Sequence, residues 1–549
     1  MAKQVQLRRG SASDHTTFTG AVGELTYVSD DKTLRIHDGA TAGGIDVGTG
    51  VINVKNYGAT GDGSTDDTTA IQAALDAAYT AGETVYVPTG TYMINALAVA
   101  SPTAHGLTVK SGVALELSPS AIIKSIPNSS PGACVIGIYN QTGVLIRGGT
   151  IEGDRTTHTG TTGEWGHCID IRGSSDVTVA EVKCIDAWGD NLYIGHGFSP
   201  EVECSDITVR GCLFMTGRRN NCSIVSADGV NITSSVFHGA AGTRPEVGID
   251  IEPNAGKPAW NITVTGCHFD SNGAAGLRVE GSNSSAYYIT VTGNTFNNNC
   301  VGLYADTAEL IGKNTNACTF IGNAISQGNM QGIRLSDLTR STVSGNSIYV
   351  TEREGIAAVT CDGINISNNT IHQSGMLTND TYSAIYLDDV TDSIVKGNLV
   401  ELGGTGNNHK YGIELTALPV SDNTNIVANN VLRAVTASLS DGNTSTTYSK
   451  NQPIWKTIFT DADTTPSVLG VEFGSFANTG STSVTALDDG RVGQELTLRL
   501  DINTTIVHDG SRLRLVGSAD YSGDANSVIR LLCITGGASS AFTEISRGS

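Results

Sequence analysis

The stretch Val247-Gly-Ile-Asp-Ile-Glu-Pro-Asn254 alternates apolar and polar residues, which predicts a short β-strand. Successive side chains of a strand point to opposite faces. Asp250 and Glu252 therefore share one face, and Ile249 and Ile251 share the other. The two isoleucines are expected to face a core, so the two acids form a pair that points outward.

The pattern of this strand returns downstream at intervals. Runs that begin with a small residue and alternate apolar side chains start at Gly276, Gly302, Gly332, Gly355, Ala384 and Gly412. Counted from Gly248, the steps between starts are 28, 26, 30, 23, 29 and 28 residues. Two or three short strands per repeat, separated by Gly and Asn turns, predict the coils of a right-handed, single-stranded parallel β-helix. The Leu and Asn signature of leucine-rich repeats is missing, and propeller blades are longer.

The composition argues against nucleic-acid binding, a membrane span and a zinc site. A chain of 549 residues is too long for one compact core, but a solenoid grows by stacking. The net charge of −21 argues against binding nucleic acid through its phosphates. No apolar run reaches the ~18 residues of a membrane span, and the N-terminus lacks the features of an export signal. The eleven cysteines show no metal-type spacing, so we expect reduced, buried thiols, no zinc, and synthesis in a reducing cytosol.

The first fifty residues read as a separate small β module with Asp-rich turns. The wording Gln6-Leu-Arg-Arg-Gly-Ser-Ala-Ser-Asp-His15, followed by Asp31-Lys-Thr-Leu-Arg-Ile-His-Asp-Gly39, closely resembles the N-terminal module of phage tail-fibre and tropism-determinant proteins. The resemblance implies attachment to a virion tail or baseplate.

The next segment, residues 51–106, contains a strand, a Gly-rich turn, and a helix that begins at an Asp cap and ends near Ala81. It resembles the opening segment of the pectate-lyase-like β-helix superfamily, in which such a helix caps the first coil. We expect the coils to occupy residues 107–440, a linker 441–453, and a C-terminal β-sandwich 454–549, for trimerisation or carbohydrate binding. The fold class is therefore all-β. A buried ladder of turn amides is expected at Asn294, Asn323, Asn346, Asn369, Asn398 and Asn429.

Stacking the coils brings equivalent positions ~4.8 Å apart. One outward column then contains Asp250 with Tyr193, Arg278, Tyr304 and Arg334, and the column two residues further on contains Glu252, Glu280 and Asp306. The acids gather in the middle coils.

Paired acids suit glycoside hydrolysis, which needs one protonated and one ionised carboxyl group. Asp250 and Glu252 are the candidate acid and base, in an order that the sequence leaves open, and Glu280 is the third candidate. Their backbone spacing favours inversion, since ~6.5 to 9.5 Å between carboxyl groups admits a water molecule. The tyrosines and arginines of the column supply stacking platforms and cations for a sugar chain. The alternative is that outward acids and arginines simply pair across strands, as Arg278 can with Asp250.

Residues 218–229 and 242–254 resemble a run found in phage depolymerases, in which this face carries the polysaccharide site. That resemblance implies Arg219 and Arg244 as neighbours of the acids. The pectate-lyase pattern of calcium-binding Asp and catalytic Arg is not matched, so we expect neither metal nor cofactor.

Together the three parts resemble a tailspike. The resemblance implies a homotrimeric virion protein, made in the host cytoplasm, that depolymerises a bacterial capsule, exopolysaccharide or O-antigen at the cell surface. We expect an endo-glycoside hydrolase without membrane insertion. One alternative is a lyase acting by β-elimination, which would recruit Arg278, Arg219, His196 and Tyr193. Another is a non-catalytic receptor-binding fibre. A groove between subunits would move the site to Asp362, Asp388 or Glu414.

Overall fold

The chain divides into two compact units, Met1–Gly217 and Arg218–Ser549. The computed structural model describes residues 6–30, 33–47, 50–300, 308–404, 406–416, 425–441, 447–449, 452–453, 457–459, 463–469, 471, 473–524 and 527–548. In these ranges no helix is both long and apolar enough to cross a membrane.

The first unit begins with a small sheet in the order β1-β2-β3-β4, in which β1 and β2 are parallel and the other pairs antiparallel. Its elements are β1 (Arg8–Gly10), α1 (Ala12–His15), β2 (Leu25–Val28), β3 (Thr33–Ile36) and β4 (Ile45–Asp46). The centre of this module is polar, because the Oγ1 of buried Thr26 lies 3.0 Å from the Nε2 atoms of both His15 and His37. A module this small can bury little apolar surface, so a satisfied polar chain fills part of its interior.

Helix α2 (Thr68–Ala81) follows the 3₁₀ turn η1 (Val54–Tyr57) and closes the start of the solenoid, as the sequence predicts. Its buried face carries Ile71, Ala74, Leu75 and Ala78. Asp67 occupies the N-cap position, but its carboxylate accepts hydrogen bonds from the backbone N–H groups of Thr60 and Gly61 instead of from the helix. The acid therefore ties the Gly-rich turn to the helix start.

The rest of the first unit consists of three parallel sheets, each with one short strand per coil. One sheet contains β5 (Val51–Asn53), β7 (Thr84–Val87), β10 (Ala114–Leu117), β13 (Thr142–Arg147), β16 (Ser175–Ala180) and β19 (Cys204–Arg210). Another contains β6 (Asp62–Asp66), β8 (Gly90–Ile94), β11 (Ala121–Ser125), β14 (Thr150–Glu152), β17 (Lys183–Ile185) and β20 (Leu213–Met215). The last contains β9 (Ala104–Thr108), β12 (Ala133–Tyr139), β15 (Ile169–Arg172) and β18 (Leu192–Gly195).

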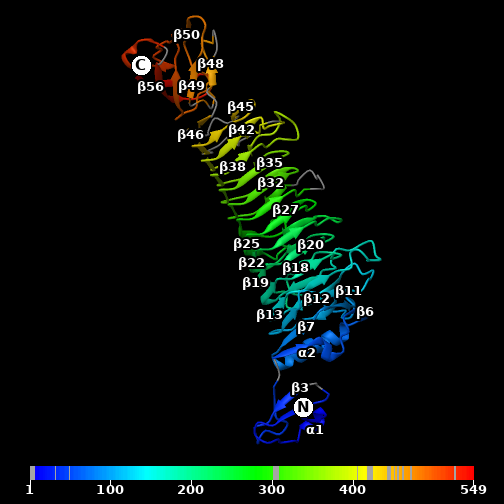
Figure 1. Cartoon of the computed structure of the whole chain (residues 1–549). Coiled ribbons are helices and arrows are strands. Elements are labelled where there is room, and N and C mark those ends of the chain that lie inside the picture. The colour runs from blue at the N-terminus through cyan, green and yellow to red at the C-terminus, as the bar shows by residue number, and fades with distance from the viewer. Residues whose placement is uncertain are drawn as a thin grey trace, which may run out of the picture. The chain divides into compact units, whose positions relative to one another are not determined.

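The second unit also has three parallel sheets, here named sheets 1, 2 and 3, whose strands stack as successive rungs (Figure 1). Sheet 1 contains β22 (Ala227–Thr233), β25 (Ala259–Thr265), β28 (Ala286–Thr292), β31 (Thr319–Ile321), β34 (Thr342–Ser344), β37 (Asn365–Ser367), β40 (Ile394–Lys396), β43 (Ile426–Ala428) and β46 (Thr447–Ser449). Sheet 2 contains β23 (Val236–His238), β26 (His268–Asp270), β29 (Thr295–Asn297), β32 (Ala324–Gly328), β35 (Ser347–Thr351), β38 (Thr370–His372), β41 (Leu399–Glu401), β44 (Val431–Leu432) and β47 (Gln452–Pro453). Sheet 3 contains β21 (Cys222–Ile224), β24 (Val247–Ile251), β27 (Ala275–Glu280), β30 (Ala308–Lys313), β33 (Gln331–Ser336), β36 (Ile356–Val359), β39 (Ile385–Asp388), β42 (Tyr411–Thr416) and β45 (Ala437–Asp441).

These sheets confirm the predicted parallel β-helix. Equivalent side chains stack inside it: the rings of Phe237, Phe269 and Phe296 are fully buried, with centroids 5.1 and 4.6 Å apart. Strands β46 and β47 pair in parallel with β43 and β44. Sheets 1 and 2 thus include residues 447–449 and 452–453, which fall in the segment that the sequence predicts to be a linker.

The C-terminal part contains two further sheets that share one apolar core, as a sandwich requires. Leu498 and Ile529 of the larger sheet and Val484 and Ile506 of the smaller one belong to that core. The larger sheet has β48 (Thr457–Phe459), β49 (Phe473–Phe476), β51 (Glu495–Arg499), β55 (Val528–Thr535), β56 (Ala541–Gly548) and β53 (Leu513–Arg514). The smaller has β50 (Thr482–Val484), β52 (Thr504–Ile506) and β54 (Tyr521–Ser522), and the 3₁₀ turn η2 is Val516–Ser518.

The turn between sheets 1 and 2 carries the amide ladder. In each buried asparagine, one side-chain N–H donates to the Oδ1 of the next asparagine at 2.9 to 3.1 Å, and another donates to a backbone carbonyl. The members are Asn294, Asn323, Asn346, Asn369, Asn398 and Asn430. The prediction of Asn429 as the last member is wrong by one residue. Asn429 has φ of 54° and occupies the left-handed turn position that Gly293 and Gly397 hold in other rungs.

We expect Asn346→Ala to lower the free energy of unfolding by about 3 kcal/mol, because each buried group left without a partner costs roughly 1 to 3 kcal/mol. The substitution removes the Oδ1 that accepts from the backbone N–H and the side chain of Asn323, and the N–H that donates to Phe320. Chemical denaturation followed by circular dichroism measures the change.

Asn365→Ala is the matched control. Asn365 lies on the neighbouring strand β37, and its buried Oδ1 accepts no hydrogen bond from the described residues. The control is expected to stay within about 0.5 kcal/mol of the unsubstituted chain, as surface-type substitutions do. Equal losses in both variants would contradict a structural role of the ladder.

Candidate functional site

The candidate site lies on sheet 3 of the second unit. The backbone register pairs Ser223 with Asp250 and Asp250 with Arg278 on successive strands β21, β24 and β27. Ile249 and Ile251 are fully buried, which confirms the predicted alternation of this strand. The outward side chains of one column therefore lie a single strand spacing apart, about 4.8 Å.

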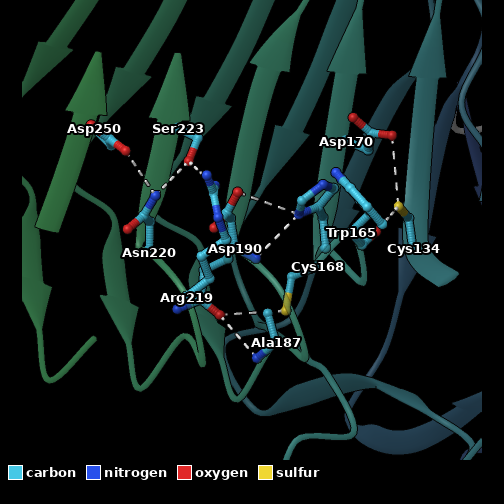
Figure 2. A network of polar contacts seen from close by, with 12 residues as sticks. Cys134, Trp165, Cys168, Asp170, Ala187, Asp190, Arg219, Asn220, Ser223 and Asp250 are labelled. Atoms are coloured by element: carbon cyan, nitrogen blue, oxygen red, sulfur yellow. Dashed lines mark hydrogen bonds and ion pairs between the residues drawn. The ribbon is translucent and has the colours of Figure 1, made fainter. Parts of the chain in front are cut away.

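Asp250 is a buried partner of Arg278. Only 1% of its surface is exposed, and Arg278 donates to both carboxylate oxygens, from Nε at 2.8 Å and from Nη2 at 2.9 Å. Asn220 donates a further hydrogen bond to Asp250 at 3.2 Å, and the same amide nitrogen reaches the hydroxyl of Ser223 (Figure 2). Asp250 is thus held as the anchor of an ion pair, and the cross-strand pairing considered as an alternative is the arrangement present.

Glu252 directly follows β24 and is the more accessible acid, with 28% of its side chain exposed. Arg278 Nη2 donates to its Oε2 at 2.9 Å. Burial and the negative charge of Asp250 raise the pKa of Glu252 above its ordinary value of 4.5, although the positive charges of Arg278 and Arg219 oppose this. The environment therefore favours the protonated form of Glu252.

The pKa of Glu280, at the end of β27, is displaced in the opposite direction. Burial would raise the pKa of Glu280, but hydrogen bonds from Ser282 and Lys313 outweigh it and hold that pKa below the ordinary value. The Nζ of Lys313 lies 3.0 Å from Oε2, and the backbone N–H of Ser282 donates to Oε1 at 3.1 Å. The charge of Glu280 also contributes to the raised pKa of Glu252. The pKa values of two neighbouring carboxyl groups are thus displaced in opposite directions.

The rung after β27 differs from the prediction. The register pairs Arg278 with Ile311 and Glu280 with Lys313. Strand β30 therefore occupies the rung that the repeat pattern predicts for residues 302–306. Tyr304 and Asp306 lie outside the described residues. Residues 302–306 and strand β30 both alternate apolar side chains. Residues 302–306 begin with a glycine and therefore resemble the repeat more closely. The consequence is chemical, because Glu280 has a cation as its neighbour on the next strand and not an acid.

The other residues that were predicted to bind substrate lie at different places. Arg219 reaches Ser223 at 3.4 Å and lowers the pKa of Glu252 by its charge, so it belongs to the site. Arg334 lies in β33, two strands beyond Arg278 in the same column. Arg244 is exposed in the loop that precedes β24. Tyr193 belongs to the first unit and is 7% exposed.

Neighbouring side chains cover the ring of Tyr193. The guanidinium of Arg172 lies 4.1 Å from the ring centroid, and the ring of His167 stacks on it at 4.7 Å. Arg172 in turn donates to buried Asp170, which also accepts from Tyr139 at 3.0 Å. Figure 2 shows Asp170 beside Cys134, whose thiol lies 3.6 Å from the carboxylate. This ring is therefore packed and is not an open platform for a sugar.

Sequence reasoning missed Ser282, Lys313 and Glu354. Ser282 lies two residues after Glu280 in a Gly turn, and Lys313 ends an alternating run. The sequence therefore carried a signal for both residues. Burial raises the pKa of Glu354, while the charges of Arg353 and Arg334 oppose the shift. Asp388 and Glu414 lie further along sheet 3 and accept hydrogen bonds from Thr416 and Ser383.

The eleven cysteines are free, buried thiols, as predicted. Within the described part of the chain, no group of three or more His, Cys, Asp or Glu side chains could hold a metal ion. The acids described above are paired with cations and hydrogen-bond donors of the chain itself.

Three family models match the chain. The model of the major tropism determinant N-terminal domain matches residues 5–41, as the resemblance of this module indicates. The model of rhamnogalacturonase A/epimerase, pectate lyase-like, matches residues 51–100. The model of the right-handed β-helix region matches residues 85–310 and 247–432, which together span more than half of the chain.

Two curated proteins are similar over parts of the chain. The uncharacterized protein YclG of Bacillus subtilis is 31% identical over 271 residues, which are 45% of this chain and 46% of YclG. The mannuronan C5-epimerase AlgE4 of Azotobacter vinelandii is 34% identical over 168 residues, which are 29% of each chain. This chain therefore spans less than half the length of either relative.

Among solved structures, tailspike protein 3 of bacteriophage CBA120 is similar with a TM-score of 0.52 and 10% identity, over 85% of this chain and 82% of that one. At this identity the likeness concerns the fold. Together with the family model that covers residues 85–432, it agrees with the three-sheet solenoid described above. The chain belongs to the family of right-handed β-helix proteins.

Proposed function

We propose that this protein is a phage tailspike that binds a bacterial surface polysaccharide and cleaves it internally by hydrolysis of glycosidic bonds. The observation that carries the proposal is the opposite displacement of two neighbouring carboxyl groups, Glu252 towards the protonated form and Glu280 towards the ionised form. Glycosidases need such a pair. The similarity to a mannuronan epimerase supports a polysaccharide as the substrate class.

Glu252 is the general acid in this proposal. It is the more exposed carboxyl group, and its raised pKa keeps a proton available for the leaving glycosidic oxygen. Glu280 is the ionised partner, held so by Lys313 and Ser282. Asp250 has no free access to substrate, so it acts by fixing Arg278 and by raising the pKa of Glu252. The roles thus differ from the initial pairing of Asp250 with Glu252.

The stereochemical expectation changes with the pair. Glu252 and Glu280 belong to neighbouring rungs, whose spacing of about 4.8 Å is close to the ~5 to 5.5 Å between the carboxyl groups of retaining glycosidases. We therefore assign Glu280 as the nucleophile that forms the glycosyl-enzyme intermediate. Glu252 would then protonate the leaving group and later activate the water that releases the product.

The N-terminal module is proposed to attach the protein to the virion. Residues 5–41 match the tropism-determinant model, and the acids of the candidate site lie in the second unit, far along the sequence from the module. In this proposal the protein is a homotrimer on the phage tail, with residues 1–50 towards the tail or baseplate and the solenoid towards the cell surface.

A second candidate function is proton abstraction from a uronic acid, as in a lyase or an epimerase. The similarity to AlgE4 over 168 residues favours it. Such chemistry needs a cation that neutralises the substrate carboxylate. Arg278 already binds two carboxylates, Asp250 and Glu252, which offset its charge. The hydrolase is therefore preferred.

We expect Glu252→Gln and Glu280→Gln each to lower kcat by about 10² to 10⁴-fold, the usual contribution of a general acid or base. The substrate is capsule or O-antigen from a bacterium on whose lawn the unsubstituted protein forms a halo. New reducing ends measure hydrolysis, and the ultraviolet absorbance of unsaturated products measures elimination. Glu401→Gln on sheet 2, which removes an acid whose carboxylate lies 3.7 Å from His372, is the matched control and should keep full activity.

Reducing ends without that absorbance, lost in both variants, support the hydrolase. Unsaturated products from the unsubstituted protein would establish a lyase. Cleavage that survives both substitutions would place the site elsewhere on the solenoid.

The pH profile should have two limbs. Activity is expected to fall as pH rises through the raised pKa of Glu252, above 4.5, because the general acid loses its proton. It should also fall as pH decreases through the lowered pKa of Glu280, below 4.5, because the nucleophile gains one. Residual activity of Glu252→Gln should lack the alkaline limb. An alkaline limb that persists unchanged in this variant would rule out Glu252 as the acid.

Asp250→Asn should lower both stability and activity, because it breaks the ion pair with Arg278 and removes a charge that raises the pKa of Glu252. The variant leaves Arg278 without its bidentate partner, and breaking such a pair costs about 3 kcal/mol when the charge that remains is largely buried. Glu252→Gln, at the more exposed position, should cost less than about 1 kcal/mol. Denaturant titration measures both. An Asp250→Asn variant of unchanged stability would contradict the structural role of the ion pair.

A further inference from the structure

A hollow of about 730 Å³ opens in the second unit directly after β27. Residues 281–285 of the loop after β27 and residues 286–288 of β28 form one side, and residues 314–316 with Asp337 and Thr339 form the other. The hollow thus begins one residue after Glu280. It is named here the Tyr288 hollow, after the aromatic side chain at its wall.

The Tyr288 hollow and Glu280 share two residues. Ser282, which lines the hollow, donates to Glu280 Oε1 from its backbone and from its hydroxyl. Asn314, on the opposite side, lies 3.4 Å from the same oxygen and also contacts the Ser282 hydroxyl. A group bound in the hollow would therefore lie next to the carboxylate that we assign as nucleophile.

Tyr288 occupies a turn position with a left-handed backbone and an exposed side chain. It follows Tyr287, which pairs with Trp260 on the previous rung and with Asn316 on the next. The corresponding residues of the other rungs also have positive φ, and this turn position accepts several residue types: Asn261, Ala317, Arg340, Gly363 and Asp392. Tyr288 has φ of 56° and is 59% exposed. Its aromatic ring buries little surface in the chain itself, which leaves the ring accessible to a ligand.

The ring of Tyr288 is held in place from behind. The ring of Tyr287 packs against it edge-on with centroids 5.1 Å apart, and Trp260 packs edge-on against Tyr287 at 5.0 Å. One face of an aromatic ring can stack on the C–H groups of a pyranose, and its hydroxyl can bind the sugar rim. A row of three aromatic rings from the neighbouring strands β25 and β28 thus supports an exposed platform.

The polar lining selects the kind of sugar. The lining residues, all of them described, comprise amides, hydroxyls and a single charged side chain, Asp337. Among the described residues no donor reaches the buried Oδ1 of Asn316, which lies in the lining. These groups accept hydrogen bonds from hydroxyls, and no lining cation offsets a carboxylate, sulfate or phosphate. An acidic residue would be repelled by Asp337.

We propose that the Tyr288 hollow is a subsite that binds an uncharged pyranose residue of the polysaccharide, stacked on Tyr288, next to the bond cleaved at Glu280. The inference rests on the proposed function in taking the ligand to be a polysaccharide. It adds that the repeating unit contains at least one neutral sugar beside the scissile bond.

Saturation-transfer NMR on the full chain tests the subsite without any need for turnover. The probes are the methyl pyranosides of glucose, galactose and mannose, with methyl glucuronide as the acidic counterpart. At least one neutral glycoside should give saturation transfer, at least fivefold stronger than the glucuronide. Tyr288→Asn should reduce it at least fivefold. Because Asn261 occupies the corresponding position one rung away, the same variant should keep or raise Tm.

Tyr349→Asn is the matched control, since Tyr349 is 52% exposed but lies in β35 on sheet 2. It should leave the glycoside signal within twofold of the unsubstituted chain. The inference is overturned if no neutral glycoside gives a signal, if the glucuronide binds as well, or if Tyr288→Asn retains the signal. It is also overturned if that variant loses Tm, because Tyr288 would then be a structural residue.

Cleavage assays separate this inference from the proposed function. A glycoside signal that depends on Tyr288, in a protein that releases no reducing ends, leaves the subsite in place and removes the hydrolase. Cleavage without any such signal removes the subsite alone. Where both hold, Tyr288→Asn should raise KM for the polysaccharide at least fivefold, with kcat changed by less than twofold.

Discussion

The second unit depends on a hydrogen-bonding constraint at the turn between sheets 1 and 2. Each ladder asparagine replaces the backbone partners that a sharp turn removes, because its amide donates to a carbonyl of the previous rung and to the next asparagine. Successive members are 29, 23, 23, 29 and 32 residues apart. Loops of unequal length can therefore leave the ladder without moving the strands on either side, and the columns of sheet 3 stay in register.

This constraint explains which parts of the fold the sequence could predict. The alternation of apolar residues and the recurrent Gly-Asn turns identified the solenoid, and five of the six ladder positions were correct. The sixth failed because two asparagines are adjacent, and only backbone conformation distinguishes Asn429 from Asn430. A second, shorter ladder through Asn221, Asn272 and Asn299 was missed, since no glycine precedes its members to mark the turn.

The site was predicted less completely, for a different physical reason. The sequence placed Asp250, Glu252, Arg278 and Glu280 on one face, and the structure brings them together. Their roles depend on neighbours one rung away, and an alternating stretch can be assigned to the wrong rung. Residues 302–306 resemble the repeat, so the repeat pattern predicted an acidic neighbour for Glu280 where the structure has Lys313. Lys313, on the strand that occupies this rung, helps to hold the pKa of Glu280 below its ordinary value.

The buried pair of Asp250 and Arg278 then has a purpose beyond its own stability. An isolated pair of this kind contributes little net free energy, because desolvation offsets most of the attraction. The pair matters more through its effect on the neighbouring acid, Glu252. The charge of Asp250 raises the pKa of that acid, while Arg278, bound to both carboxylates, fixes where its Oε2 lies. Removing Arg278 alone would leave two acids in repulsion, and removing Asp250 alone would let Arg278 hold Glu252 in the ionised form. In the proposed mechanism, the complete triad both positions Glu252 and keeps its pKa above the ordinary value, which is what a general acid requires.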